Sequence, residues 1–251
     1  MTMRYFILLA MVFGLMGCQS TPSLPAASSI HTLVPEPTVI FNGDRARPYI
    51  ALTFDACQSP DDQLADYDAA IIDTLTSTKT PATLFLGGLW MQQYSEQTRT
   101  LAANPLFELG NYGWSHADFG MINPQEMNRE IERTQELMVT LTGRKPVLFR
   151  FPRDSYTQEA LGVVVQHGLQ AVKWDGDSGD RDPGISAESI LEEITDQAQN
   201  GSIVIMHMNG WGYHTAEALP EVIKQLGEQG YTFVTVSQLL RSNETGVSHQ
   251  E

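Results

Sequence analysis

The sequence is short of basic residues and of cysteine. Its 251 residues contain 15 Lys and Arg against 30 Asp and Glu, a formal net charge of −15. Contacts with nucleic-acid phosphates need a basic surface, so this charge argues against a nucleic-acid partner. The two cysteines, Cys18 and Cys57, are too few for a disulfide framework. The chain also lacks a glycine-rich phosphate loop, because the pair Gly87-Gly88 does not have the spacing of a nucleotide-binding fingerprint.

Long apolar runs are also scarce, and the one that stands out lies at the N-terminus, from Tyr5 to Met16. It is too short for a transmembrane helix, which needs about 20 residues. Arg4 precedes it and Leu-Met-Gly-Cys closes it, a pattern that resembles the signal of bacterial lipoproteins. We therefore predict a lipoprotein signal peptide over 1–17 and a lipid on Cys18. The alternative is an ordinary signal peptide with an incidental cysteine.

The lipoprotein signal also predicts a location. Gln19, rather than Asp, follows Cys18, which in lipoproteins favours the outer membrane. We therefore expect a protein of the bacterial cell envelope that faces the periplasm and touches the membrane only through its lipid anchor.

The rest of the chain divides by composition. Residues 18–47 are rich in Ser, Pro, Thr and Ala and predict a flexible tether, and residues 242–251 form a polar tail. Over 48–241, short apolar runs alternate with helical patterns. This alternation predicts a single α/β domain, a distorted or incomplete (β/α) barrel of about seven parallel strands. The expected strands are Tyr49–Phe54, Ala82–Leu86, Leu106–Leu109, Val147–Phe151, Ala171–Trp174, Ile203–His207 and Phe233–Val236, and the expected helices are Asp68–Thr76, Pro124–Thr142, Thr157–His167, Ala187–Ala198 and Ala216–Glu228.

Charged or ionisable side chains occur where five of these strands end. They are Asp55, His116, Arg150, Asp180 and His207. Taken singly, each has an ordinary alternative as a turn, a cap or a surface residue. The carboxyl ends of parallel strands meet at one mouth of a barrel, so together they predict a functional site there.

These runs, in this order, resemble the polysaccharide deacetylases with a NodB homology domain, carbohydrate esterase family 4. The similarity covers about Tyr49 to Leu240. Five segments carry it: Thr53-Phe54-Asp55, Asn111 to His116, Phe149-Arg150-Phe151-Pro152, Asp177-Ser178-Gly179-Asp180 and Ile205-Met206-His207.

The resemblance implies a hydrolase that removes acetyl groups from N-acetylated sugars with a divalent metal, zinc or else cobalt, held by Asp-His-His. Carried over by position, Asp55 would be the general base and Arg150 would orient it. His207 would be the general acid, set by Asp180, and His116 would be a metal ligand. We also place Asp55 as a second candidate metal ligand and Trp114, Asp177 and Trp211 as candidate sugar contacts.

Four positions depart from the family pattern. Ala56 stands where the metal-binding Asp belongs, and Tyr112 stands where the first His belongs. Arg153 replaces the usual Tyr after Pro152, and Arg181 replaces a Trp. A catalytic zinc wants three protein ligands, so the metal survives only if other residues supply them.

Five candidates could replace the lost ligands: a Tyr112 phenolate and the carboxylates of Asp61, Asp62, Asp66 and Asp68. Asp68 is more simply a helix N-cap. We expect Cys57 to be a small buried apolar residue and His214 to lie at the surface.

Three functions remain open from the sequence. The leading hypothesis is a hydrolase that deacetylates an N-acetylated, peptidoglycan-like glycan at the cell envelope. The second is a catalytically inactive carbohydrate-binding or scaffold lipoprotein on the same fold. The third is an esterase or amidase that acts on another small acylated substrate. The sequence names neither the glycan nor a protein partner.

Overall fold

The computed structural model describes residues 37–60 and 65–241. The predicted signal peptide, Cys18 and the polar tail lie outside the described residues, as do Asp61 and Asp62.

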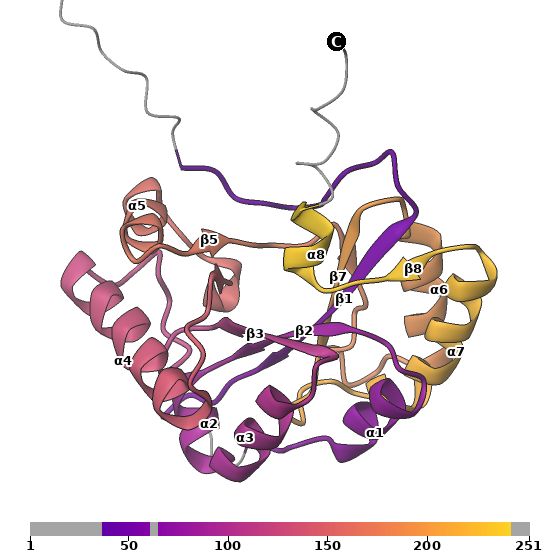
Figure 1. Ribbon diagram of the computed structural model, residues 1–251, viewed down its shortest axis with the longest axis horizontal. Helices are drawn as coiled ribbons and strands as arrows, with labels where there is room; N and C mark the ends of the chain where they lie inside the picture. Colours follow the sequence, from indigo (N-terminus) through magenta and orange to yellow (C-terminus); the bar gives the residue numbers. More distant parts are fainter. Residues whose placement is uncertain (1–36, 61–64, 242–251) are drawn as a thin grey trace, which may run out of the picture. The chain divides into compact units, whose positions relative to one another are not determined.

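A curved sheet of parallel strands forms the centre of the domain (Figure 1). Its main path runs β5-β4-β3-β2-β1-β7-β6, and the short β8 pairs with the start of β1. Seven parallel strands in an open barrel confirm the predicted fold class. The strands are β1 (Tyr49–Ala56), β2 (Ala82–Leu86), β3 (Phe107–Asn111), β4 (Leu148–Phe149), β5 (Gln170–Ala171), β6 (Gly176–Asp177), β7 (Ser202–His207) and β8 (Thr232–Phe233).

The two central strands are buried along almost their whole length. From Ile50 to Ala56, and from Ser202 to His207, every residue is buried. Parallel strands that are covered on both faces are buried along their length. This explains why both strands are nearly continuous apolar runs in the sequence.

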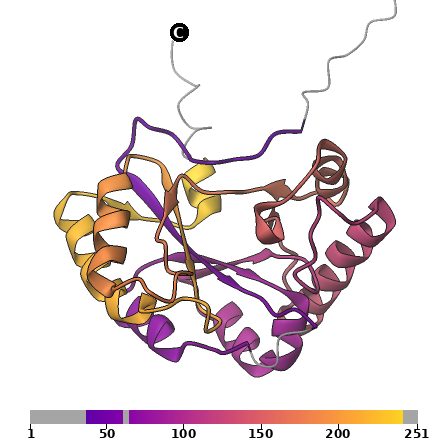
Figure 2. The same ribbon diagram turned by 180° about the vertical axis from the view of Figure 1, so that it is seen from behind.

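Helices cover the outside of the sheet (Figures 1 and 2). The longest, α4, begins where Asn123 caps it in a capping box with Glu126 and ends at Gly143, whose φ is 70°. Asp68 caps α1, as predicted. The helices are α1 (Ala69–Ser77), α2 (Gly88–Gln93), α3 (Ser95–Ala103), α4 (Pro124–Thr142), α5 (Gln158–Gln166), α6 (Ala187–Gln197), α7 (Thr215–Glu228) and α8 (Val236–Arg241), with one 3-10 turn, η1 (Pro152–Asp154).

The segment before β1 belongs to the domain, which corrects part of the predicted tether over 18–47. Ile40 donates its N–H to the carbonyl of Ala171 and accepts from Lys173 N–H. Gly43 donates to the carbonyl of Gly201, just before β7. These hydrogen bonds join residues that are far apart in sequence, so the local composition of the segment could not predict them.

Helices α2 and α3 are absent from the sequence-based prediction. Gly87 is the N-cap of α2, and Gly88 is its first residue. A side chain at Gly88 would meet the Trp114 ring at 2.1 Å, so the glycine permits a close approach of helix and loop. The prediction of a single strand over Ala171–Trp174 is also wrong. Strand β5 ends at Ala171, where it pairs with β4, and the chain pairs with β7 only from Gly176, in β6.

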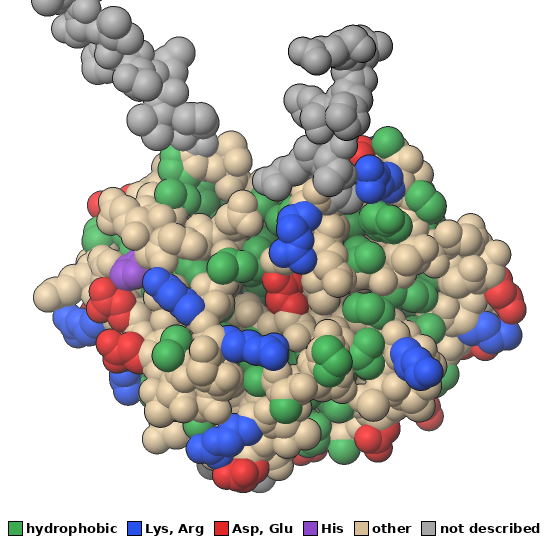
Figure 3. Space-filling model, in the orientation of Figure 1, with side chains coloured by type: hydrophobic (Ala, Val, Ile, Leu, Met, Phe, Trp, Pro, Cys, Tyr) green, Lys and Arg blue, Asp and Glu red, His purple; other side chains and the backbone are tan. Residues whose placement is uncertain are grey.

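On the face shown in Figure 3, basic and acidic side chains alternate, with hydrophobic side chains between them. No helix among residues 37–60 and 65–241 combines the length and apolar character that a membrane span requires.

Candidate active site

The first polar pair of the barrel mouth joins Asp55, near the end of β1, to Arg150, just after β4. Arg150 Nη1 lies 2.7 Å from Asp55 Oδ1, and both side chains are fully buried. Burying two charges is costly unless they are paired, and this pairing offsets that cost. The second carboxylate oxygen, Asp55 Oδ2, is also buried and has no hydrogen-bond partner among the residues described. An unpaired buried carboxylate oxygen is energetically costly, which marks Asp55 as a candidate proton acceptor.

Arg150 is held by several further groups inside the barrel. Nη1 also donates to Thr53 Oγ1 at 2.9 Å, and Nη2 donates to the Lys173 carbonyl at 3.1 Å. Its guanidinium carbon lies 4.1 Å from the centre of the Phe85 ring. Since so many partners fix the guanidinium, it holds the Asp55 carboxylate in one orientation.

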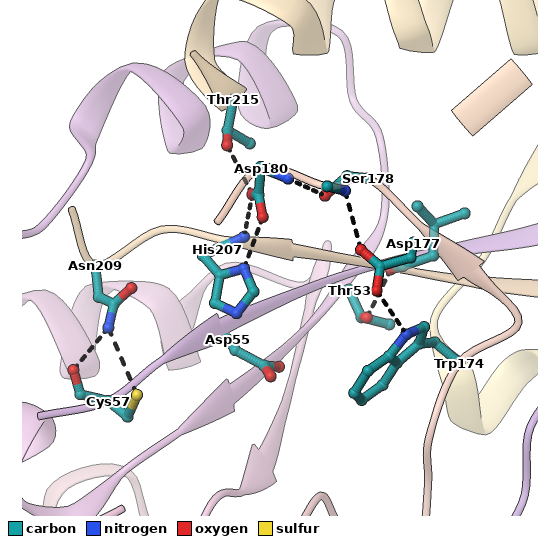
Figure 4. A network of polar contacts seen from close by, with 12 residues as sticks. Thr53, Asp55, Cys57, Trp174, Asp177, Ser178, Asp180, His207, Asn209 and Thr215 are labelled. Carbon is teal, nitrogen blue, oxygen red and sulfur yellow. Dashed lines mark hydrogen bonds and ion pairs between the residues drawn. The ribbon is translucent and has the colours of Figure 1, made fainter. Parts of the chain in front are cut away.

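The second pair joins His207, the last residue of β7, to Asp180, which follows β6 (Figure 4). His207 Nδ1 lies 2.8 Å from Asp180 Oδ1, and the backbone N–H of His207 donates to Asp180 Oδ2 at 2.7 Å. Thr215 Oγ1 donates to the same Oδ2 at 2.7 Å. A carboxylate that accepts from Nδ1 fixes the imidazole tautomer and the orientation of the ring.

Close packing sets the position of this second pair. A side chain at Gly212 would come within 2.2 Å of the His207 carbonyl oxygen and 3.0 Å of Asp180 Oδ2. Only glycine therefore lets the loop between β7 and α7 wrap around Asp180.

The two pairs are neighbours because β1 and β7 pair in parallel, with Asp55 opposite His207. Side chains two residues apart on a strand share a face, so Cys57 and Asn209 continue the same rows. Asn209 Nδ2 donates to the Cys57 carbonyl at 2.7 Å, and Cys57 is buried as predicted. In Figure 4 the His207 ring nitrogen remote from Asp180 points toward Asp55.

A cavity of about 160 Å³ opens at this mouth. His207 and Tyr112 lie in its wall, and Asp55, which is fully buried, is not among its lining residues. Drug-sized ligands occupy pockets of roughly 300–1,000 Å³, so this cavity suits one small group such as an acetamido rather than a whole sugar chain. The residues lining it are Tyr112, Arg153, Asp154, Trp174, Asp177, Arg181, Ile205 and His207.

Tyr112 is held in its neutral form. Burial raises the pKa of its hydroxyl well above 10, and the nearby Asp55 charge raises it further. The hydroxyl is therefore a hydrogen-bond donor at neutral pH.

The residues described do not fit the family's metal. Ala56, at the position of the Asp ligand, presents a buried methyl group, and Tyr112 presents a phenol where the first His belongs. Asp55 Oδ1 is taken by Arg150. Within the described ranges, no group of three or more His, Cys, Asp or Glu side chains could hold a metal ion. Of the candidate replacement ligands, Asp68 serves as a helix cap.

His116 lies beside the mouth, as predicted. Its ring centre lies 5.6 Å from that of Tyr112 and 5.5 Å from that of Trp211, with the His116 and Trp211 rings edge to face, and its backbone has a positive φ of 56°. Trp211 is thus close to the candidate site, and Asp177 lines the cavity itself.

Trp114, the other candidate sugar contact, is placed elsewhere. Its ring packs against Gly88, and the guanidinium carbon of Arg133 lies 3.9 Å from the ring centre. It is not part of the cavity wall. His214 is exposed and pairs with Glu217 at 2.7 Å, in agreement with its predicted surface position.

Sequence reasoning missed several residues of the site. Thr215 and Gly212 had no signal beyond the polar stretch that follows His207. Thr53 lies inside a quoted motif but was given no role. Arg153 and Arg181 were noticed only as departures from the family pattern, although both line the cavity.

Comparisons with known proteins agree with this geometry. The family model "Polysaccharide deacetylase" matches residues 42–172, more than half of the chain. The peptidoglycan-N-acetylmuramic acid deacetylase PdaC of Bacillus subtilis is 32% identical over 197 residues, which span 78% of this chain and 39% of that protein.

Two solved structures are also similar. One is a peptidoglycan N-acetylglucosamine deacetylase, 26% identical, with a TM-score of 0.74 over 81% of this chain and 92% of that one. The other, a CE4 family pseudoenzyme from Bacillus anthracis, is 23% identical, with a TM-score of 0.73 over 81% of this chain and 69% of that one. Together with the retained pairs Asp55–Arg150 and His207–Asp180, these matches show that the chain belongs to the polysaccharide deacetylase family.

Proposed function

We propose that this protein removes N-acetyl groups from an N-acetylated, peptidoglycan-like glycan of the bacterial cell envelope. The observation that carries the proposal is the retention, side by side, of two buried ionisable pairs. Asp55 is fixed by Arg150 and His207 is fixed by Asp180, and the two lie opposite each other on paired strands. Related proteins named as peptidoglycan deacetylases support the substrate class.

The two pairs divide the proton transfers of amide hydrolysis. Asp55 Oδ2 accepts a proton from the attacking water, and the new C–O bond forms at the acetyl carbon. His207 in its protonated form gives its Nε2 proton to the sugar nitrogen as the C–N bond breaks, which releases acetate and the free amine. The neutral Tyr112 hydroxyl, in the cavity wall, donates a hydrogen bond to the developing oxyanion. No step here uses a metal.

A second function is favoured by a specific observation, the loss of ligand chemistry at Ala56 and Tyr112. A protein that keeps the cleft but not the reaction would bind the glycan as a scaffold. One fold neighbour is described as a CE4 pseudoenzyme, and a mutant of it as having restored enzymatic activity.

The cellular location is part of the same proposal. The N-terminal sequence supports a lipid on Cys18 and an outer-membrane protein that faces the periplasm. A glycan of the cell wall would lie within reach of a domain on such a tether.

Acetate release from purified glycan strands tests the reaction. We expect release by the purified full chain, a loss of at least a hundredfold in His207→Gln and Asp55→Asn, and no change in His214→Gln. His214 is a matched control because it is an exposed histidine of the same loop. Glycan binding without acetate release would contradict the hydrolase and favour the scaffold.

The metal is tested separately, by elemental analysis of the full chain after zinc loading, with His116→Ala as the control. About one zinc per chain that is lost in His116→Ala would show a ligand set that includes residues beyond those described. Zinc no higher than background would support the metal-free reaction if acetate is released, and the scaffold if it is not.

A further inference from the structure

The cavity at the barrel mouth carries more positive charge than an acetamido group needs. Two of the residues that line it are arginines, Arg153 from η1 and Arg181 from the turn after Asp180. Both arginines are exposed, and they line the same opening as His207. Asp154 and Asp177 line the same opening, so its two arginines balance two carboxylates in a chain whose net charge is −15.

The acidic side chains of the opening already have partners. Asp154 Oδ1 lies 2.6 Å from Lys173 Nζ. Asp177 accepts from Trp174 Nε1 at 3.3 Å and from the backbone N–H of Gly179 at 2.9 Å. Asp154 is therefore paired with a cation other than the two arginines, and the neutral donors hold Asp177 in place.

The arginines are positioned but not neutralised. Arg153 donates Nε to the carbonyl of His116 at 3.3 Å, and the guanidinium carbon of Arg181 lies 5.9 Å from the centre of the Trp211 ring. Neither guanidinium forms an ion pair with any residue in the part of the chain that the structure describes. Each therefore keeps N–H groups that can bind an anion.

The backbone holds Arg153 at the opening at some cost. Its φ of 58° lies in the left-handed region, which non-glycine residues rarely adopt. Such conformations persist where surrounding contacts fix them, and here the turn aims the residue at the mouth.

We propose that Arg153 and Arg181 bind a carboxylate on the substrate sugar, so that the preferred substrate is an acidic N-acetylated sugar of the N-acetylmuramic acid type. In that sugar a lactyl ether, which ends in a carboxylate, is attached to the carbon next to the one bearing the acetamido group. An acetamido beside His207 therefore leaves the carboxylate near the rim of the cavity. Guanidinium and carboxylate are matched in geometry and charge. The inference rests on the proposed function, because it assumes that the cavity takes an acetamido group.

Binding to two disaccharides that differ in the carboxylate tests it. Calorimetry with the full chain compares N-acetylglucosaminyl-N-acetylmuramic acid with neutral N,N′-diacetylchitobiose. We expect the acidic sugar to bind roughly tenfold more tightly, with a preference that shrinks at high salt. In the double variant Arg153→Gln/Arg181→Gln the two sugars should bind about equally, because the neutral one loses no ion pair.

Arg144→Gln is the matched control. Arg144 is an exposed arginine just after α4 and close to β3, and its replacement removes one positive charge, against two in the double variant. It should keep the preference for the acidic sugar. Circular dichroism checks that each variant is folded.

The outcomes separate the two proposals. Equal binding of both sugars by the wild-type chain, or a preference that persists in the double variant, would overturn the role of the arginines while the proposed function stands. Binding of neither sugar would overturn both.

Discussion

Replacing Arg150 by methionine tests how much the stability of the fold depends on the buried pair at the barrel mouth. Both Arg150 and Asp55 have no exposed side-chain surface. Removing one partner leaves an uncompensated buried charge, which costs about 3–5 kcal/mol. The variant also leaves the carbonyls of Val172 and Lys173 without this donor. We therefore expect Arg150→Met to lower the free energy of unfolding by about 3–5 kcal/mol.

Two further variants separate charge from packing. In Asp55→Asn/Arg150→Met no buried charge is left alone, so the double variant should be more stable than Arg150→Met by roughly 1–3 kcal/mol. Arg45→Met is the surface control. Arg45 lies 2.5 Å from Asp175, but its side chain is 41% exposed, so its loss should cost less than about 1 kcal/mol.

Urea unfolding of the purified protein, followed by the fluorescence of its four tryptophans, measures these differences. The reasoning is refuted if Arg150→Met stays within about 1 kcal/mol of the wild type, or if the double variant is no more stable than Arg150→Met. A changed m-value would show that the denatured state, rather than the buried pair, had been altered.

Three other predictions concern the same mouth. In Tyr112→Phe, the free energy of unfolding should fall less steeply above pH 10 than in the wild type, as measured by urea unfolding between pH 8 and 11. The pKa of Tyr112 is raised in the folded chain, so the folded chain keeps this proton after the unfolded chain has lost it. Alkaline pH therefore favours unfolding of the wild type. An identical pH dependence would contradict the buried neutral phenol. Asp180→Asn should lower acetate release by about 10²–10⁴-fold through loss of the His207 orientation, whereas an effect below about threefold would remove Asp180 from the mechanism. Gly212→Ala should lower the free energy of unfolding by about 2 kcal/mol or more because of the 2.2 Å contact with the His207 carbonyl, and a thermal melt like that of the wild type would show that the loop relaxes freely.

The sequence predicted those parts of the fold that depend on neighbours along the chain. Helix α4 followed from Asn123-Pro124 and a repeat of apolar residues, and the structure places its N-cap and its end where these residues predict. Strand β2 was predicted at its observed limits, because a short run that is buried on both faces is largely apolar. Helix α2 was missed because it is only six residues long and begins with a glycine, and only the nearby Trp114 ring explains that glycine.

The sequence by itself also determined which ionisable residues end the strands, since each follows an apolar run whose length and composition are local properties. Only the tertiary structure decided how they pair. Asp55 meets Arg150 across 95 residues of chain, and His207 meets Asp180 across 27. It likewise decided that Trp114 packs against α2 and that Arg153 and Arg181 share one opening. Such pairings depend on strand order, register and burial, which bring distant residues together and which no local pattern encodes.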